Sequence, residues 1–239
     1  MINLRSILIL LALLLSQTVW AEDNSLIESY NKGMFKFNDS VDQIALKPVA
    51  KAYKAVLPSP LQTGIKNFFS NLGDGWTAIN QFLQGKPNEG ISDAGRFVIN
   101  STFGIFGLFD VASMDKIPKH TEDFGQTVGK WGVGEGSYLV LPILGPSTLR
   151  DTLSLPVDWL ADPVSYVGDI PVRNTMYVVR GVNDRRNLLK ATDSIDEMAI
   201  DRYQAYKNAW LSHRRYEVSD GTYVAPDEGP SEEPTQTTP

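Results

Sequence analysis

The chain has 239 residues, with 22 Lys and Arg against 28 Asp and Glu, and a net charge of −6 at pH 7. An acidic chain without a block of basic residues argues against a nucleic-acid partner. The sequence contains no cysteine, which excludes disulfides, thiol chemistry and cysteine-based metal sites.

Residues 1–21 have the pattern of a secretory signal peptide. Arg5 supplies a positive start, and residues 7–15 form an apolar segment shorter than the ~20 residues of a membrane span. We expect cleavage between Ala21 and Glu22 and an exported mature chain. A retained N-terminal membrane anchor is the alternative that this pattern leaves open.

The first half of the mature chain predicts helices, each marked by apolar residues at steps of three and four. They run over residues 25–44, 48–56, 61–72, 76–83 and 88–102. Pro48 and Pro58 mark breaks because proline lacks an N–H donor, and Gly85 has the position of a helix-ending glycine. Residues 103–110, FGIFGLFD, are apolar and punctuated by two glycines.

A glycine-rich segment lies in the middle of the chain. A short helix is predicted over 124–131, followed by GVGEG at 132–136 and YLVLPILGPSTLRD at 138–151. The glycines predict a tight reversal with positive φ, since no strand precedes them and no Lys-Ser/Thr follows, as a phosphate-binding loop would require. Residues 138–151 predict a short apolar arm that turns at Gly145-Pro146 and restarts as a helix at Ser147.

Two longer helices are predicted at the C-terminal end, over 172–190 and 194–215, with breaks before them at Pro156 and Pro163. The second begins with a capping box at Ser194 and Glu197. Residues 219–239 are too poor in apolar residues to offset the entropy of ordering and predict a disordered tail. With no internal repeat and no step in composition, we expect one all-α domain over 22–218.

No pattern predicts catalysis, and we expect no catalytic residue, no metal and no cofactor. His120, close to Glu122 and Asp123, is the one combination that suggests a general base or a metal ligand, but a third ligand at helical spacing is missing. His213 stands at a helix end, where a cation suits the helix dipole. A periplasmic lipid or ester hydrolase is the enzymatic alternative.

The most apolar stretches leave two interpretations open. Segments of 10–14 apolar residues belong either to a buried core or to helices that lie at a membrane interface. A core would make the chain a soluble helical adaptor, whereas exposed faces would place it at a lipid surface.

Four segments give the chain a specific resemblance to the MlaA family, also called VacJ, over about residues 25–206. They are MFKFND at 34–39, NFFSNLGD at 67–74, FLQGKP at 82–87 and EDFGQTVGKWGVGEGSYLVLPILGPSTLRD at 122–151. The resemblance implies a ring of amphipathic helices within the inner leaflet of the Gram-negative outer membrane, with a central amphipathic channel. It implies a role in outer-membrane asymmetry, in which phospholipids leave the outer leaflet through the channel. The implied partners are a trimeric outer-membrane porin and a periplasmic lipid-binding carrier.

The resemblance also implies a hairpin that gates the channel. It corresponds best to the glycine segment and the residues after it: Gly132, Gly134, Gly136, Tyr138, Pro142, Gly145 and Pro146. Lys130 and Arg150 are candidates to meet a lipid phosphate; an ion pair of Arg150 with Asp151 is the alternative. Family members are typically lipoproteins anchored by a cysteine, which this chain lacks. We therefore expect its attachment to rest on helix faces and the porin.

Overall fold

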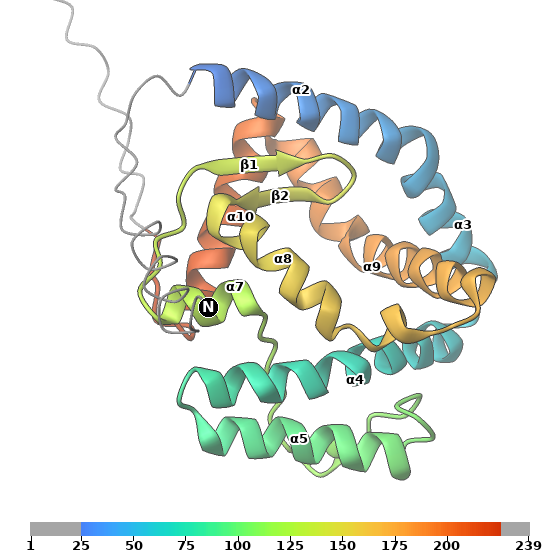
Figure 1. The fold of residues 1–239 in the computed structure, drawn as a ribbon. Coiled ribbons are helices and arrows are strands. Elements are labelled where there is room, and N and C mark those ends of the chain that lie inside the picture. The colour runs from blue at the N-terminus through green and yellow to red at the C-terminus, as the bar shows by residue number, and fades with distance from the viewer. Residues whose placement is uncertain (1–24, 226–239) are drawn as a thin grey trace, which may run out of the picture.

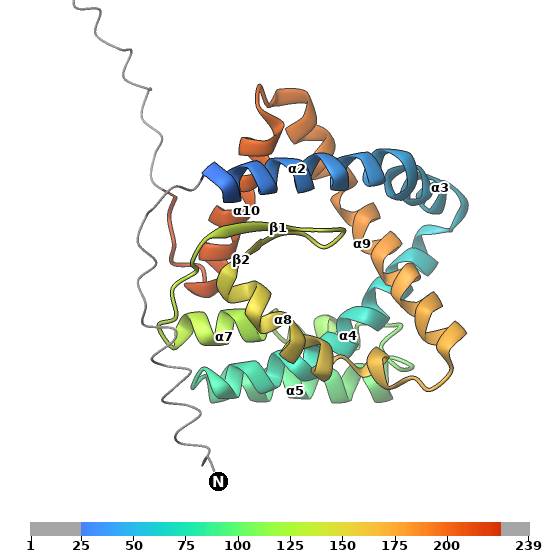
Figure 2. The same cartoon turned by 45° about the horizontal axis from the view of Figure 1, so that its top comes forward.

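Helices arranged in a ring surround a two-stranded hairpin in the computed structural model, which describes residues 25–225 (Figures 1 and 2). The predicted all-helical, single-domain fold is confirmed, apart from the hairpin. The predicted cleavage site between Ala21 and Glu22 lies outside the described residues. Residues 226–239 of the predicted tail lie outside them as well.

The first half of the chain contains α2 (Ser25–Val41), a π-helical turn (Asp42–Leu46), α3 (Lys47–Val56), α4 (Ser59–Leu83) and α5 (Pro87–Thr102). It runs from α2 on one side of the ring to α4 and α5 on the opposite side (Figure 1). The two helices predicted over 61–72 and 76–83 are one continuous helix. A glycine inside a helix costs only about 1 kcal/mol, and Phe97 of α5 lies against Gly75 at the point where a break was expected. Gly85 follows α4 with a φ of 77°, as predicted.

The second half contains α6 (Val111–Met114), α7 (Phe124–Lys130), α8 (Leu149–Ala161), a 3₁₀ turn (Pro163–Tyr166), α9 (Ile170–Met198) and α10 (Arg202–Val218). The break predicted at Pro156 was wrong, since α8 continues through this residue. The helix only lacks the one hydrogen bond that the N–H of residue 156 would donate if it were not proline. The capping box at Ser194 was wrong too. Ser194 lies inside α9, and Asp201 caps α10 by accepting a hydrogen bond from the backbone N–H of Gln204.

Residues 138–148 form a β-hairpin instead of the predicted apolar arm. Strand β1 (Tyr138–Leu141) pairs antiparallel with β2 (Gly145–Thr148), and the turn is Pro142–Leu144, not Gly145-Pro146. The alternation of side chains along β1 is the reason: Tyr138 and Val140 are buried while Leu139 and Leu141 are less so. In Figure 2 the hairpin extends from the side of α10 towards α9, along the α2 side of the central opening.

The small apolar core lies where this hairpin meets α2 and α10. Tyr138 and Val140 of β1 pack against Tyr203 of α10, and Met34 and Phe35 of α2 cover them. The ring is continued by α3 against α9, α9 against α4, and α7 against both α4 and α8. The hairpin is therefore anchored on one side of the ring, and its tip is not part of the core.

Candidate functional site

The distribution of polar and apolar side chains is the reverse of that in an ordinary soluble domain. Polar residues outnumber apolar ones among the buried side chains, and the largest fully buried side chain is that of Arg96. Large apolar side chains are exposed on almost every helix; examples are Leu26, Ile44, Val56, Leu61, Ile91, Val98, Met114, Leu160, Val178 and Leu188. Extended exposed apolar surface of this kind marks an interaction with another protein or with a membrane.

The apolar stripe predicted on the first helix illustrates this reversal. Leu26 is 81% exposed and Ile44 is 80% exposed, whereas Asn31 on the opposite face of α2 is 1% exposed. Both ends of the stripe therefore face outwards, whereas the side of the helix towards the hairpin combines Asn31 with Met34 and Phe35.

Within residues 25–225, no helix combines the length and the apolar character needed to cross a membrane.

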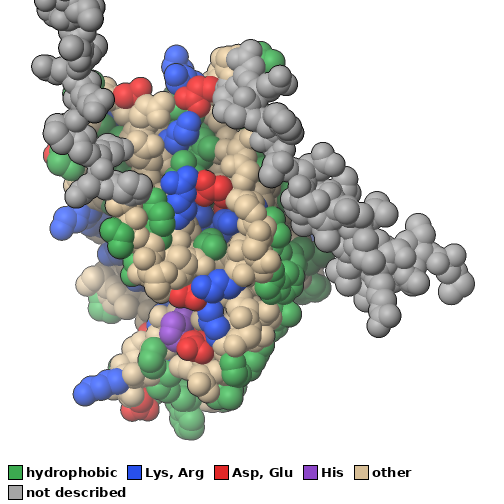
Figure 3. Space-filling view, turned by 90° about the vertical axis from the view of Figure 1, so that its left-hand side faces the viewer, with side chains coloured by type: hydrophobic (Ala, Val, Ile, Leu, Met, Phe, Trp, Pro, Cys, Tyr) green, Lys and Arg blue, Asp and Glu red, His purple; other side chains and the backbone are tan. Residues whose placement is uncertain are grey.

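Charged side chains gather in a band on one side of the molecule. Figure 3 shows Lys and Arg interleaved with Asp and Glu down the middle of this face, with hydrophobic side chains along its margins and lower edge. Ion pairs connect Arg215 of α10 to Glu135 at 2.6 Å and Lys130 of α7 to Asp220 at 2.5 Å. Polar and apolar surfaces thus lie next to one another, as contact with a lipid that has a charged head and apolar tails requires.

Two asparagines of α2 hold the outer edge of the hairpin. Asn31 donates from Nδ2 to the carbonyl of Tyr138 at 2.8 Å and accepts from the N–H of Val140 at 2.8 Å. Asn38, two helical turns later, does the same with the carbonyl of Leu141 at 2.8 Å and the N–H of Ile143 at 2.7 Å. Each amide side chain takes the place of a neighbouring strand, so the free edge of β1 is satisfied.

The hairpin base is buried between α2 and α10. Burial raises the pKa of Tyr138 to about 12, with a further contribution from the nearby carboxylate of Glu28. Glu28 itself accepts hydrogen bonds from the hydroxyl of Tyr203 and from Lys207, both at 3.0 Å. In contrast, Ile143 and Leu144 at the tip are more than half exposed. The hairpin is thus fixed at its base and presents an apolar tip.

The glycine loop at 132–136 precedes the hairpin and does not form part of it. Gly132 and Gly136 have φ values of 97° and 68°, as predicted for a reversal, while Gly134 is not among the glycines with positive φ. The backbone N–H groups of Leu149 and Arg150 donate to the carbonyls of Ser137 and Glu135 at 2.9 and 3.2 Å. The far end of the loop is therefore tied to the start of α8.

An open hollow of about 440 Å³ lies beside this loop. It is lined by Gly129, Gly132, Val133, Gly134, Glu135, Arg150, Arg215, Val218 and Ser219. A Cβ atom added to Gly132 or Gly134 would meet no other atom within 4 Å, so this side of the loop is unpacked. The predicted site residues are thus divided: Gly132, Gly134 and Arg150 line the hollow, whereas Lys130 and Gly136 do not. Tyr138 is buried in β1, Pro142 lies in the hairpin turn, and Gly145 and Pro146 belong to β2.

A buried ionic network lies behind the hollow. Arg214 of α10 contacts Asp123, the N-cap of α7, at 2.7 Å and Asp151 of α8 at 3.0 Å. Arg150 donates from Nε to Asp151 at 2.9 Å, so the predicted ion pair of these two neighbours is present. A Cβ atom on Gly125 would lie 2.5 Å from an oxygen of Asp151, which leaves only glycine at this position. The network fixes α7, α8 and α10, the three helices around the base of the loop.

The loss of folding stability at low pH is expected to depend on Asp151. Burial raises the pKa of this carboxyl, but hydrogen bonds from Arg214 and Arg150 outweigh burial and hold the pKa below its usual 3.8. The resulting stabilisation is present above pH 3.8 and is lost as the pH falls through the lowered pKa of the folded state. We expect Asp151→Asn to be less stable at pH 7 and to lose less further stability below pH 4.

Urea unfolding in detergent between pH 7 and pH 3 measures this dependence. Only the difference between the wild type and Asp151→Asn is informative. Burial raises the pKa of Asp74 and Asp158, so their contributions to the pH dependence of stability have the opposite sign to that of Asp151. Parallel profiles for the wild type and Asp151→Asn would contradict the expectation.

Neither candidate for the lipid phosphate is a free cation. Arg150 is 7% exposed and holds Asp151, and Lys130 holds Asp220. Asp220 belongs to the start of the tail that was predicted to be disordered. Its described part, residues 219–225, forms a turn after α10, where Asp220 contacts Lys86 as well as Lys130.

The histidines do not assemble the constellation that the enzymatic alternative needs. His120 lies 3.0 Å from Asp93, and neither Glu122 nor Asp123 contacts it. Glu122 accepts from Gln84 instead, and Asp123 caps α7. His213 lies 3.2 Å from Glu217 on the same helix. Among the described residues no group of three or more acidic or histidine side chains is placed to hold a metal ion.

Sequence reasoning missed the residues that position the site: Asn31, Asn38, Asp123 and Arg214. The seven-residue spacing of the two asparagines, with apolar residues between them, was a signal for polar contacts on one helix face. No comparable signal marks Arg214, whose partners are 63 and 91 residues away.

Comparison with known proteins gives a consistent result. The family model described as MlaA lipoprotein matches residues 23–217. A protein of Escherichia coli K12 named intermembrane phospholipid transport system lipoprotein MlaA is 33% identical over 215 residues, covering 88% of this chain and 84% of its own. The Haemophilus influenzae protein of the same name is 31% identical, over 85% of this chain and 83% of its own.

A solved structure is similar as well. It comes from a study of the structural basis for maintenance of bacterial outer membrane lipid asymmetry, and its chain is 34% identical with a TM-score of 0.72. The match covers 82% of this chain and the whole of the other. The ring, the hairpin and the glycine loop all lie inside the region that the family model matches.

Proposed function

We propose, since the chain belongs to the MlaA lipoprotein family, that it is the outer-membrane component of an intermembrane phospholipid transport system. In this role it removes phospholipids from the outer leaflet and so maintains lipid asymmetry. The relatives in Escherichia coli and Haemophilus influenzae carry the name of that system.

The observation that carries the proposal is the reversed distribution of side chains. A ring with an apolar outside and a polar inside suits a location among acyl chains, where the outer face meets lipid and buried polar groups are satisfied internally. A soluble adaptor would have to leave all of this apolar surface in water, at about 25 cal/mol for each Å².

The finer parts of the mechanism are inferred from the arrangement of the ring. The middle of the ring would form the amphipathic passage, and the hairpin that lies along one side of it would control access (Figure 2). Two features support a movable hairpin: its tip is exposed, and the loop before it contains glycines with open space around them. Phospholipids would then pass to a periplasmic lipid carrier, while a trimeric porin would cover part of the outer apolar face.

The hollow beside the glycine loop is the proposed place for a lipid head group. Arg150 and Arg215 both line it, and Lys130 lies at the end of the helix that leads to the loop. A phosphate would share these cations with Asp151, Glu135 and Asp220, which already hold them. The arginines and the lysine would exchange a carboxylate for the phosphate and back again. Such exchange suits brief contact with a passing lipid more than long-lived binding.

The proposal predicts a membrane-permeability defect in cells that lack the protein. Deletion of its gene is expected to increase sensitivity to detergent with EDTA and to raise the phospholipid content of the outer leaflet, because misplaced lipid is no longer removed. Outer-leaflet phospholipid is measured by its accessibility to an added phospholipase. Unchanged outer-leaflet phospholipid in the deletion strain would overturn the proposal.

Two controls separate the alternatives. The protein is expected to remain with outer membranes through a salt wash, whereas a soluble adaptor would be released with the osmotic-shock fluid. We propose that the protein acts without catalysing a reaction, so a His120→Ala variant is expected to restore the deletion strain fully. Loss of complementation by a folded His120→Ala protein would favour a hydrolase.

A further inference from the structure

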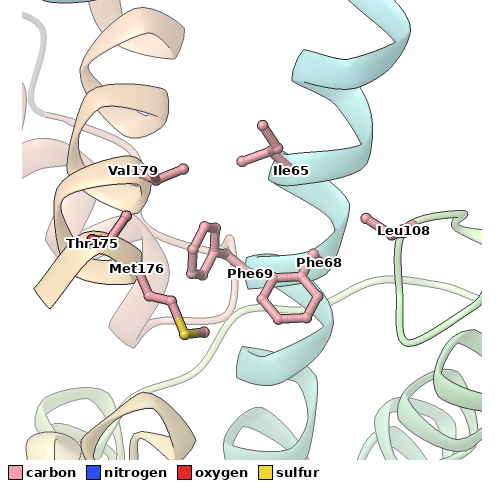
Figure 4. Close-up of a pocket in the computed structure, with 7 residues that line it drawn as sticks. All are labelled: Ile65, Phe68, Phe69, Leu108, Thr175, Met176 and Val179. Atoms are coloured by element: carbon pink, nitrogen blue, oxygen red, sulfur yellow. The ribbon is translucent and has the colours of Figure 1, made fainter. Parts of the chain in front are cut away.

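A second hollow, outside the site described above, lies between α4 and α9. Ile65, Phe68 and Phe69 of α4 face Thr175, Met176 and Val179 of α9, and Leu108 closes one end (Figure 4). We refer to it as the α4–α9 groove; its volume is about 210 Å³ and it is open to the surface.

The groove is lined by apolar side chains with one exception, Thr175 at its exposed rim. That is unusual in a molecule whose buried side chains are mostly polar. A water molecule needs two to four polar partners to be held in a cavity, and Thr175 is the one lining residue with a polar side chain. Apolar cavities of about 150 Å³ already take up a molecule of the size of benzene, so the groove has room for a segment of several methylene groups.

We propose that the α4–α9 groove binds one acyl chain of a phospholipid. A peptide segment in the groove would leave its backbone N–H and C=O groups without partners, at a cost that an acyl chain does not have. The uncharged, almost entirely apolar lining is therefore complementary to a hydrocarbon chain.

The groove is continuous with the outer apolar surface. Leu108 belongs to the loop at 103–109, which also exposes Phe103, Phe106 and Phe109. Ile105 and Phe106 have φ values of 53° and 56°, a conformation that costs free energy and directs their side chains outwards from a fixed loop. On the α9 side, Val178 is exposed next to the groove. An acyl chain at this surface therefore has exposed apolar side chains next to the groove on both the loop side and the α9 side.

One edge of the groove carries a cation held in place by aromatic rings. The guanidinium of Arg180 lies 5.7 Å from the ring centre of Phe69 and 5.1 Å from that of Tyr177, and it pairs with Asp162. The polar boundary therefore begins directly beside Phe69, which limits an apolar ligand to the groove itself.

Photolabelling of the full chain tests this inference, which rests on the proposed function. The protein is reconstituted in vesicles of phosphatidylethanolamine and phosphatidylglycerol that contain a phospholipid with a diazirine in one acyl chain. After illumination, adducts are mapped by mass spectrometry. We expect adducts on Phe69 and Met176, and also on the exposed Phe106.

The variants distinguish the groove from general contact with lipid. Thr175→Trp fills the groove from its exposed rim and is expected to reduce labelling of Phe69 and Met176 at least fivefold, without change at Phe106. Val178→Trp, three residues along the same helix and facing outwards, is expected to leave all three adducts unchanged. Val179→Trp provides a second groove-filling variant with the same expectation as Thr175→Trp.

The outcomes are separable. Labelling of Phe106 without labelling of Phe69 and Met176, or equal labelling in Thr175→Trp and the wild type, would overturn the groove and leave the proposed function intact. If Phe106 is not labelled either and the protein does not stay with the vesicles, the membrane location itself fails.

Discussion

Replacement of Arg214 by methionine is expected to lower the free energy of unfolding by about 3–5 kcal/mol. Methionine retains much of the apolar stem but leaves the carboxylates of Asp123 and Asp151 without the guanidinium that joins them. Arg214 is 8% exposed, so water cannot replace the lost contacts fully. Urea unfolding of the purified protein in mild detergent measures the change, and a loss of α7 and α8 from the folded unit would appear as reduced helix content.

The next residue of the same helix is the matched control. Arg215 makes an ion pair of similar geometry with Glu135 at 2.6 Å, but its side chain is 41% exposed. Exposed pairs contribute at most about 1 kcal/mol, so Arg215→Met is expected to cost a small fraction of what Arg214→Met costs. Equal costs would mean that burial of the network does not determine its contribution.

The difference between the two arginines also shows what the sequence could and could not predict. Helix stripes, proline breaks and the glycine after α4 are set by neighbours within a few residues, and most of them were predicted correctly. The partners of Arg214 are distant in sequence, and only the closing of the ring brings them together. An SHRR segment on a helix looks the same whether its arginines are buried or in water.

The hairpin shows a second limit. A run of apolar residues hides the alternation that distinguishes a strand from a short helix, so YLVLPIL was consistent with both. Its actual structure depends on Asn31 and Asn38, more than 100 residues earlier, which satisfy the edge of β1. Pro146 could be placed in β2 because a two-stranded hairpin has a free edge on which a missing N–H costs little.

The reversed surface could not be predicted for a different reason. Periodicity shows that a helix has an apolar side, but not whether that side faces a protein core or a lipid. Leu26 and Ile44 belong to a stripe that is indistinguishable in sequence from a core stripe. The polar residues were the better indicator, since Asn31 and Asn38 occur on the opposite face at a spacing of two helical turns.

Asn31→Leu is expected to release the base of the hairpin and to lower the free energy of unfolding by about 2–4 kcal/mol. Leucine has nearly the shape of asparagine but leaves the carbonyl of Tyr138 and the N–H of Val140 unpaired, and each unpaired buried group costs about 1–3 kcal/mol. Val140 is 1% exposed, so water does not reach this part of the strand in the intact protein. Urea unfolding gives the cost, and hydrogen exchange at the amide of Val140 locates it.

Asn38→Leu provides the matched control at the other end of the same strand edge. It removes the same pair of hydrogen bonds, but the partner N–H of Ile143 lies at the exposed tip, where water takes the place of the lost side chain. A cost of about 1 kcal/mol or less is expected for this variant, together with faster exchange confined to the tip. If both variants cost the same, or if Val140 remains protected in Asn31→Leu, then the asparagines do not hold the hairpin. In that case the apolar contacts of Tyr138 with Tyr203 and Trp210 are what keeps it in the ring.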